Sequence, residues 1–250
     1  MTTDVQPSSP PNPPPEKKPN VFQRIAGVLF APAETFQDIA RRPDVLGPLL
    51  FILVVGYLST AVLMPKLDLS TMLTQQAEKM RERDSNMSDE QIAQMERITA
   101  AGAKVMFWVF PVLFVLWYVI VAGALLLAFK LMDGEGTFKQ AFSVTLYSWM
   151  PMVLLGILST IIALARGSFD PVMAATIVKS NPAFLADMKE QPVLFALLSS
   201  LDLFTIWMLA LLIVGCAAMA KTSKTKAAAI VISLWIALTV AKLGMAALNS

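Results

Sequence analysis

Five long apolar runs constrain the fold of this chain more than any other feature of its sequence. They cover residues 46–64, 105–131, 142–165, 193–219 and 227–247. A helix needs about 20 apolar residues, at about 1.5 Å each, to cross a hydrocarbon core about 30 Å thick. A helix also satisfies its own backbone hydrogen bonds, which lipid cannot do. We therefore predict an all-α integral membrane bundle of about five transmembrane helices.

The composition agrees with a membrane location and excludes much chemistry. The chain is 56% hydrophobic and 15% charged, against about 25% charged in soluble domains. It has no histidine, which excludes Ser-His and Cys-His catalytic pairs, His-ligated zinc and haem held by histidine. Its one cysteine, Cys216, lies in an apolar run, and the net charge of +2 is too balanced for nucleic-acid binding. We expect no catalytic residue, cofactor, metal or nucleic-acid partner.

The N-terminal region divides into two parts. Residues 1–20 hold seven of the sixteen prolines and almost no large apolar side chain, which predicts a disordered Pro-rich tail. Residues 21–42 form short amphipathic pieces that carry Arg24, Arg41 and Arg42. These pieces either lie in the membrane interface, with the arginines among anionic headgroups, or pack on the cytoplasmic side of the bundle. The sequence leaves both interpretations open.

Residues 65–104 form the only sizeable soluble element that the sequence predicts. They are rich in helix formers, and Ser88 is followed three residues later by Gln91, the spacing of a capping box. We predict an extramembrane helical hairpin with its turn at residues 84–87. Its second arm can run straight into the second span.

Prolines and glycines mark special backbone within and between the spans. Pro111 and Pro151 lie inside the second and third runs, where each removes a backbone hydrogen bond and predicts a kink. The loop at residues 133–136 reads Asp-Gly-Glu-Gly, and its glycines suit a tight turn. Two carboxylates are too few for a calcium site, and the loop lacks the Lys and Ser/Thr of a phosphate-binding loop. We interpret it as a turn.

Asp202 is the only acidic residue inside an apolar run and the best single candidate for a functional site. A carboxylate at membrane depth costs about 2.5 kcal/mol or more, so it usually faces a bundle interior or a water-filled path. Ser199 and Thr205, three residues to either side, predict a polar stripe on one helix face. Asp202 either fixes helix packing or caps a broken helix, or it lines an ion or proton path. All these interpretations stay open.

The basic residues give an orientation. Counts on the two sides of the membrane are equal, but Arg41 and Arg42 abut the first span and the turn at residues 221–226 is purely basic. Compact basic segments close to spans favour the cytoplasm, so we predict a cytoplasmic N-terminus.

Three stretches carry a family resemblance that covers residues 21–247. They read LFAPAETFQDIARRPDVLGPLL before the first span, GEGTFKQAFSVTLYSWMPMVL around the third, and LDLFTIWMLALLIVG followed by KTKAAAIV in the fourth. Together they resemble the Yip family, the Ypt/Rab-GTPase-interacting membrane proteins, and particularly its bacterial branch. The positions that match the family pattern are Pro32, Phe36, Gly136, Phe138, Tyr147, Pro151, Asp202 and Trp207.

The resemblance implies that residues 21–250 form one five-helix membrane domain in the cytoplasmic (inner) membrane of a bacterium, with its N-terminus in the cytoplasm. The family supplies no established catalytic residues. Eukaryotic relatives bind prenylated small GTPases, but the short, weakly charged tail here argues against that partner.

From the residues and the resemblance together we hypothesise a non-enzymatic multi-pass protein. It would act as a scaffold or membrane-organisation factor within the lipid bilayer, through helix packing with a second copy or with other membrane proteins. The alternative is a small transporter or channel with a path past Asp202. A lipid-modifying enzyme has only the basic residues between Arg24 and Arg42 in its favour.

Overall fold

The computed structural model describes residues 19–63, 65, 88–165, 177–187 and 190–248. Within these ranges the chain forms helices and no strand. In chain order the elements are α1 (Val21–Phe30), α2 (Pro32–Arg41), α3 (Leu46–Leu63), α5 (Asp89–Leu131), α6 (Phe138–Ser148), α7 (Met150–Ala165), the 3-10 helix η2 (Pro182–Leu185), α9 (Pro192–Ser200), α10 (Leu203–Ala220) and α11 (Lys224–Leu248). The predicted Pro-rich tail, apart from its last two residues, and the first arm and turn of the predicted hairpin lie outside the described residues.

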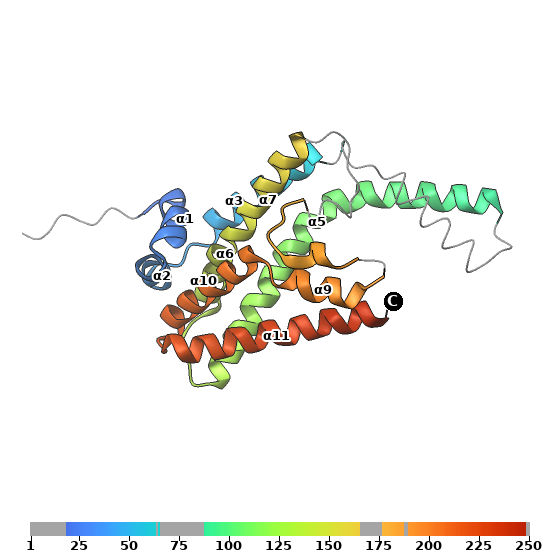
Figure 1. The fold of residues 1–250 in the computed structure, drawn as a ribbon. Helices are drawn as coiled ribbons and strands as arrows, with labels where there is room; N and C mark the ends of the chain where they lie inside the picture. The colour runs from blue at the N-terminus through green and yellow to red at the C-terminus, as the bar shows by residue number, and fades with distance from the viewer. Residues whose placement is uncertain (1–18, 64, 66–87, 166–176, 188–189, 249–250) are drawn as a thin grey trace, which may run out of the picture.

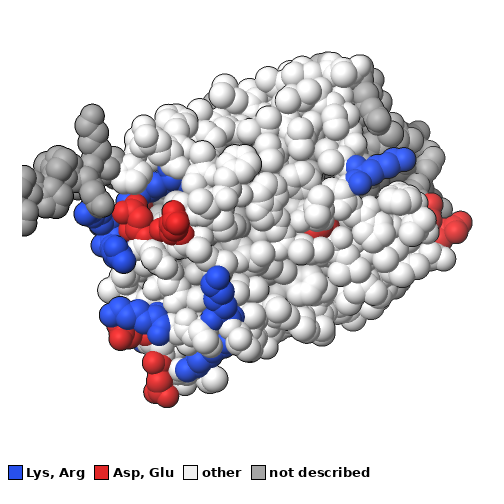
Figure 2. Space-filling model, turned by 60° about the vertical axis from the view of Figure 1, so that its left-hand side comes forward, with Lys and Arg blue, Asp and Glu red and all other residues white. Residues whose placement is uncertain are grey.

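Five helical segments are long and apolar enough to cross a bilayer: Leu46–Leu63, Val112–Leu131, Phe138–Ala165, Leu203–Ala220 and Lys224–Leu248. Lys, Arg, Asp and Glu side chains gather at the end of the molecule that carries α1 and α2 and again at the opposite end (Figure 2). Between the two ends the surface in view is almost entirely uncharged, apart from one small acidic spot (Figure 2). The predicted all-α membrane bundle is therefore confirmed.

Helices α1 and α2 form a cap on one end of the bundle (Figure 1). A capping box between Asn20 and Gln23 begins α1, and Pro32 occupies the first turn of α2, where a missing N–H costs nothing. Phe36 and Ile39 of α2 are fully buried, and α2 packs against α6 and α10. Of the two interpretations, packing holds for α2. Below, this end is called the cap end and the opposite end the far end.

Helix α5 joins two predicted elements in one continuous helix of 43 residues. Ser88 and Gln91 form the predicted capping box at its start, with hydrogen bonds in both directions. The second arm of the predicted hairpin does run straight into the second span. The first half of α5 projects away from the bundle and its second half lies within it, with a change of direction between them (Figure 1).

The third span consists of two helices, because α6 ends at Ser148 and α7 begins at Met150. The N–H of Trp149 is shared between the carbonyls of Thr145 and Leu146, at 3.2 and 3.3 Å. Pro151 lies just past this break and has no N–H to continue the helical pattern. The helix is thus interrupted two residues before Pro151, where the sequence predicted a kink.

The fourth apolar run differs from the prediction of a single helix over 193–219. Helix α9 ends at Ser200, Leu201 and Asp202 leave the helical conformation, and α10 begins at Leu203. An apolar run carries no signal for this break, since either side of it is equally hydrophobic. The break instead depends on the side chain of Asp202, which begins a new helix.

The core lies where α2, α6 and α10 meet. Every residue of α6 from Ala141 to Ser148 is buried. Gly215 of α10 allows the close approach: a Cβ atom there would lie 2.6 Å from Val144 and 2.9 Å from the ring of Phe36. Helix α6 is therefore the central element of the bundle.

Candidate functional site

Asp202 is the N-cap of α10. Its Oδ1 accepts hydrogen bonds from the backbone N–H groups of Phe204 and Thr205, at 2.8 and 3.2 Å. These two donors belong to the four N–H groups that a helix start leaves without partners. The residue is only 4% exposed, so the capping takes place in the interior.

The second carboxylate oxygen of Asp202 is held by a segment about twenty residues earlier in the chain. The hydroxyl of Ser180 donates to Oδ2, and the amide of Asn181 lies 3.5 Å from it. The N–H of Leu203 donates to the carbonyl of Ser180 at 3.0 Å. A carboxylate has about four lone-pair positions, and the protein itself supplies four donors.

The polar stripe predicted from Ser199, Asp202 and Thr205 is divided by the helix break. Ser199 lies on α9, where its hydroxyl and that of Ser200 accept hydrogen bonds from Lys242 Nζ at 3.1 and 3.3 Å. Thr205 meets Asp202 through its backbone N–H. The structure thus brings Thr205 to Asp202 and gives Ser199 a different partner.

A cavity of about 280 Å³ adjoins Asp202. Its polar wall consists of Ser159 of α7, Ser180, Asn181 and Asp202, and its apolar wall includes Leu155. Within the described part of the chain, no Lys or Arg forms an ion pair with Asp202. The cavity therefore presents a buried carboxylate whose hydrogen bonds are satisfied and which forms no ion pair with a described residue.

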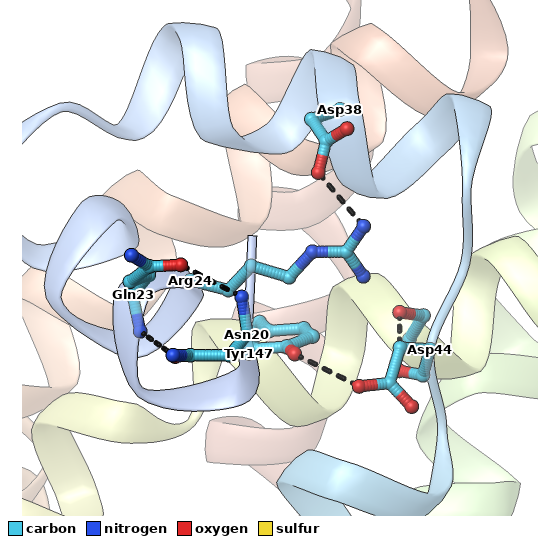
Figure 3. Close-up of polar contacts among 7 residues, drawn as sticks. Asn20, Gln23, Arg24, Asp38, Asp44 and Tyr147 are labelled. Carbon is cyan, nitrogen blue, oxygen red and sulfur yellow. Dashed lines mark hydrogen bonds and ion pairs between the residues drawn. The ribbon is translucent and has the colours of Figure 1, made fainter. Parts of the chain in front are cut away.

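A second polar cluster lies under the cap and joins α1 and α2 to the bundle (Figure 3). Arg24 is buried and donates from Nη2 to Asp38 of α2 at 2.8 Å. The hydroxyl of Tyr147 in α6 donates to Asp44 Oδ2 at 3.3 Å, and Ser143 donates to the Asp44 carbonyl at 2.8 Å. The interfacial interpretation is therefore wrong for Arg24, which lies inside the protein.

At the cap end, the turn at residues 133–136 and the turn at residues 221–226 are joined by polar contacts. Glu135 and Lys221 form an ion pair at 2.7 Å, and Lys226 donates to the carbonyl of Met132. The hydrogen bond and the charge of Lys221 lower the pKa of Glu135. Gly136, at φ +121°, approaches Met219 in a conformation that favours glycine. The predicted turn is thus an anchoring point between α5 and α10.

The order of these features along one chain matches a known family. Residues 26–245 match the Yip1 domain. This chain belongs to the Yip1 domain family. The match covers α2, the first four candidate spans and the fifth as far as residue 245, and it confirms the resemblance to the Yip family. No curated protein and no solved structure matches the chain.

The positions of the Yip1 pattern mostly serve packing. Phe36, Tyr147 and Pro151 are buried in the core, Pro32 begins α2 and Asp202 begins α10. Trp207 packs at the edge of the core, and Gly136 turns the chain beside Met219. Phe138 is 43% exposed and stacks on Phe142, with ring centroids 5.7 Å apart.

The partners of Asp202, Arg24 and Tyr147 were not predicted from the sequence. Ser180 and Asn181 were not candidates, although Asn181 before Pro182 has the pattern of a helix start, and it does cap η2. Asp38 and Asp44 were also missed, because their contacts with Arg24 and Tyr147 cross between elements. No local spacing in the sequence marks such a contact.

Proposed function

We propose that this Yip1 domain protein is a non-enzymatic membrane scaffold that acts through helix packing with protein partners. The proposal rests on one observation: the side chains at the family-pattern positions make contacts within the chain itself. Phe36 and Tyr147 are buried between the cap and the bundle, and Asp202 is bound by four donors of its own chain. Side chains committed to internal contacts favour a role for the shape of the molecule over a role in chemistry.

Two spans offer faces on which a partner could pack. In α3 and α11 only 11% of the span residues are buried within the chain. Exposed apolar side chains such as Leu50 of α3 and Ile236 of α11 would meet either lipid tails or another membrane helix. We propose a second copy of the chain or other membrane proteins as partners, and not small GTPases.

Site-specific photo-crosslinking in native membranes tests the scaffold. A photoreactive residue at Ile236 or Leu50 should give discrete protein adducts, because these side chains face outward. The same residue at Val231, which is buried on the same α11 helix, is the matched control and should give only internal products. Lipid adducts alone at both exposed positions would contradict the proposal.

We also propose that the cap end lies in the cytoplasm, and the resemblance to the bacterial branch supports the cytoplasmic membrane of a bacterium. Basic side chains outnumber acidic ones among the described residues of the cap end, as expected for a cytoplasmic surface. The basic residues there are Arg24, Arg41, Arg42, Lys130, Lys139, Lys221, Lys224 and Lys226, and the acidic ones are Glu34, Asp38, Asp44, Asp133 and Glu135.

No observation favours the alternative of a transporter or channel with a path past Asp202. The carboxylate is fixed by four protein donors and serves as a helix cap. A lipid-modifying enzyme built on the basic interfacial patch is also not favoured, since Arg24 is buried in its ion pair with Asp38.

A further inference from the structure

Two cavities of different character adjoin each other along α7. The first is the polar cavity beside Asp202, of about 280 Å³. The second, of about 330 Å³, lies between α3, α5 and α7 and is mainly apolar. Met152 and Gly156 line both cavities. The two spaces therefore adjoin the same part of α7, and together they are called the groove, with an apolar part and a polar end.

The apolar part opens on the surface of the bundle. Phe110 and Phe114 of α5 line it and are 46% and 40% exposed, whereas Tyr118, one turn further along α5, is buried. Gly56 of α3 and Gly156 of α7 also line it, and a Cβ atom at either would meet nothing within 4 Å. The space exists because these two glycines have no side chain to fill it, and aromatic rings border it.

Helix lengths place the groove in the half of the bundle toward the far end. Helix α10 has 18 residues, which places Asp202 about 27 Å from the cap end of that helix. Trp149, at the inner end of the apolar part, follows the 11 residues of α6 and so lies about 16 Å from the cap end. In a hydrocarbon core about 30 Å thick, Trp149 lies near the midplane and Asp202 near the far boundary.

We propose that this groove binds one phospholipid from the leaflet at the far end, with an acyl chain in the apolar part and an amine headgroup beside Asp202. The depth places the chain toward the midplane and the headgroup at the boundary, as in the bilayer itself. Asp202 supplies charge complementarity, because its carboxylate has no ion-pair partner among the described residues. An ammonium headgroup would provide the missing cation, and an anionic headgroup would be repelled.

Native mass spectrometry of the purified, delipidated full chain tests the headgroup. The probes are phosphatidylethanolamine and phosphatidylglycerol with identical acyl chains, each added to the detergent solution. We expect one phosphatidylethanolamine per chain, retained about tenfold more tightly than phosphatidylglycerol, as one poorly screened charge contact would give. Asp202→Asn should lower phosphatidylethanolamine retention to the level of phosphatidylglycerol, because asparagine also caps helices well but carries no charge.

A second pair of variants tests the apolar part of the groove. Gly156→Leu should fill it and abolish retention of both lipids without a clash, since the position faces open space. Gly123→Leu is the matched control, because Gly123 also faces open space but does not line the groove, and it should bind as the wild type does. Equal retention of the two lipids by the wild type, or retention by Gly156→Leu equal to that of Gly123→Leu, would overturn the proposal.

Discussion

At the scale of single residues, Asp202 and Arg24, the buried charged side chains among the described residues, each have specific hydrogen-bonding partners. Asp202 caps α10 and binds Ser180, while Arg24 pairs with Asp38 between the two helices of the cap. The sequence pointed to Asp202, because a carboxylate in an apolar run is rare. It could not point to Ser180, since the contact depends on how a segment about twenty residues earlier folds back.

The helix cap of Asp202 gives a first prediction. Asp202→Ala removes the acceptor for two N–H groups and should lower the free energy of unfolding by about 1–2 kcal/mol. Asp202→Asn keeps a capping oxygen and should lose much less. Thermal unfolding in detergent measures both, and equal losses for alanine and asparagine would show that capping is not the stabilising role.

The ion pair between Arg24 and Asp38 gives a second prediction: removing one partner should cost more stability than removing the other. Asp38→Ala leaves the Arg24 guanidinium, only 6% exposed, without its counter-charge and should destabilise the chain by about 3 kcal/mol. Arg24→Leu should cost less, because Asp38 is 29% exposed and water can solvate it. Chemical unfolding of the two variants compares the costs, and the reverse order would contradict the burial argument.

At the scale of elements, most of the helices follow from length, capping and proline placement. The capping box at Ser88 and the break beside Pro151 were both predicted from local sequence. The break at Leu201 and Asp202 was one of the open interpretations, in which Asp202 caps a broken helix, but hydropathy is uniform across it and could not place it. The packing of α2 on the bundle was one of two open interpretations, since an amphipathic face fits protein and membrane surfaces alike.

The contact between α2, α6 and α10 gives a third prediction. Gly215→Ala places a methyl group 2.6 Å from Val144 and 2.9 Å from Phe36, so the helices must separate. The expected loss of stability is about 1–3 kcal/mol, typical of overpacking. Gly123→Ala, where a Cβ meets nothing within 4 Å, is the control and should not destabilise. Thermal unfolding in detergent distinguishes the two, and equal melting temperatures would refute the tight crossing.

At the scale of the whole molecule, the two ends differ in construction. The cap end combines two helices, two fastened turns and an excess of basic residues, while the far end holds the Asp202 cavity and α9. This division follows from the membrane: charges collect where water is available, and the belt between must satisfy its polar groups internally. The family, the helical class and the spans could be read from the sequence, whereas the cavities depend on the complete packing.

The proposed orientation gives a fourth prediction. In a Cys216→Ala background, Thr225→Cys at the cap end should react with a membrane-impermeant thiol reagent only after the cells are lysed. Glu190→Cys at the far end should react with intact cells, since both side chains are exposed. The wild type is the blank, because Cys216 is 1% exposed. The opposite labelling pattern would reverse the topology.

The burial of α6 bears on how the chain enters the membrane in the cell. From Ala141 to Ser148 its side chains touch protein on every side, and three of them are Ser or Thr. A freshly inserted α6 would expose these hydroxyls to lipid, where Ser143 would lack the Asp44 carbonyl that accepts its hydrogen bond in the folded protein. It packs against α5, which precedes it in the chain, and against α10, which follows only after α7, η2 and α9. We therefore expect the insertion machinery to retain α6 until α10 has been synthesised, so that the central helix enters the bilayer already surrounded by protein.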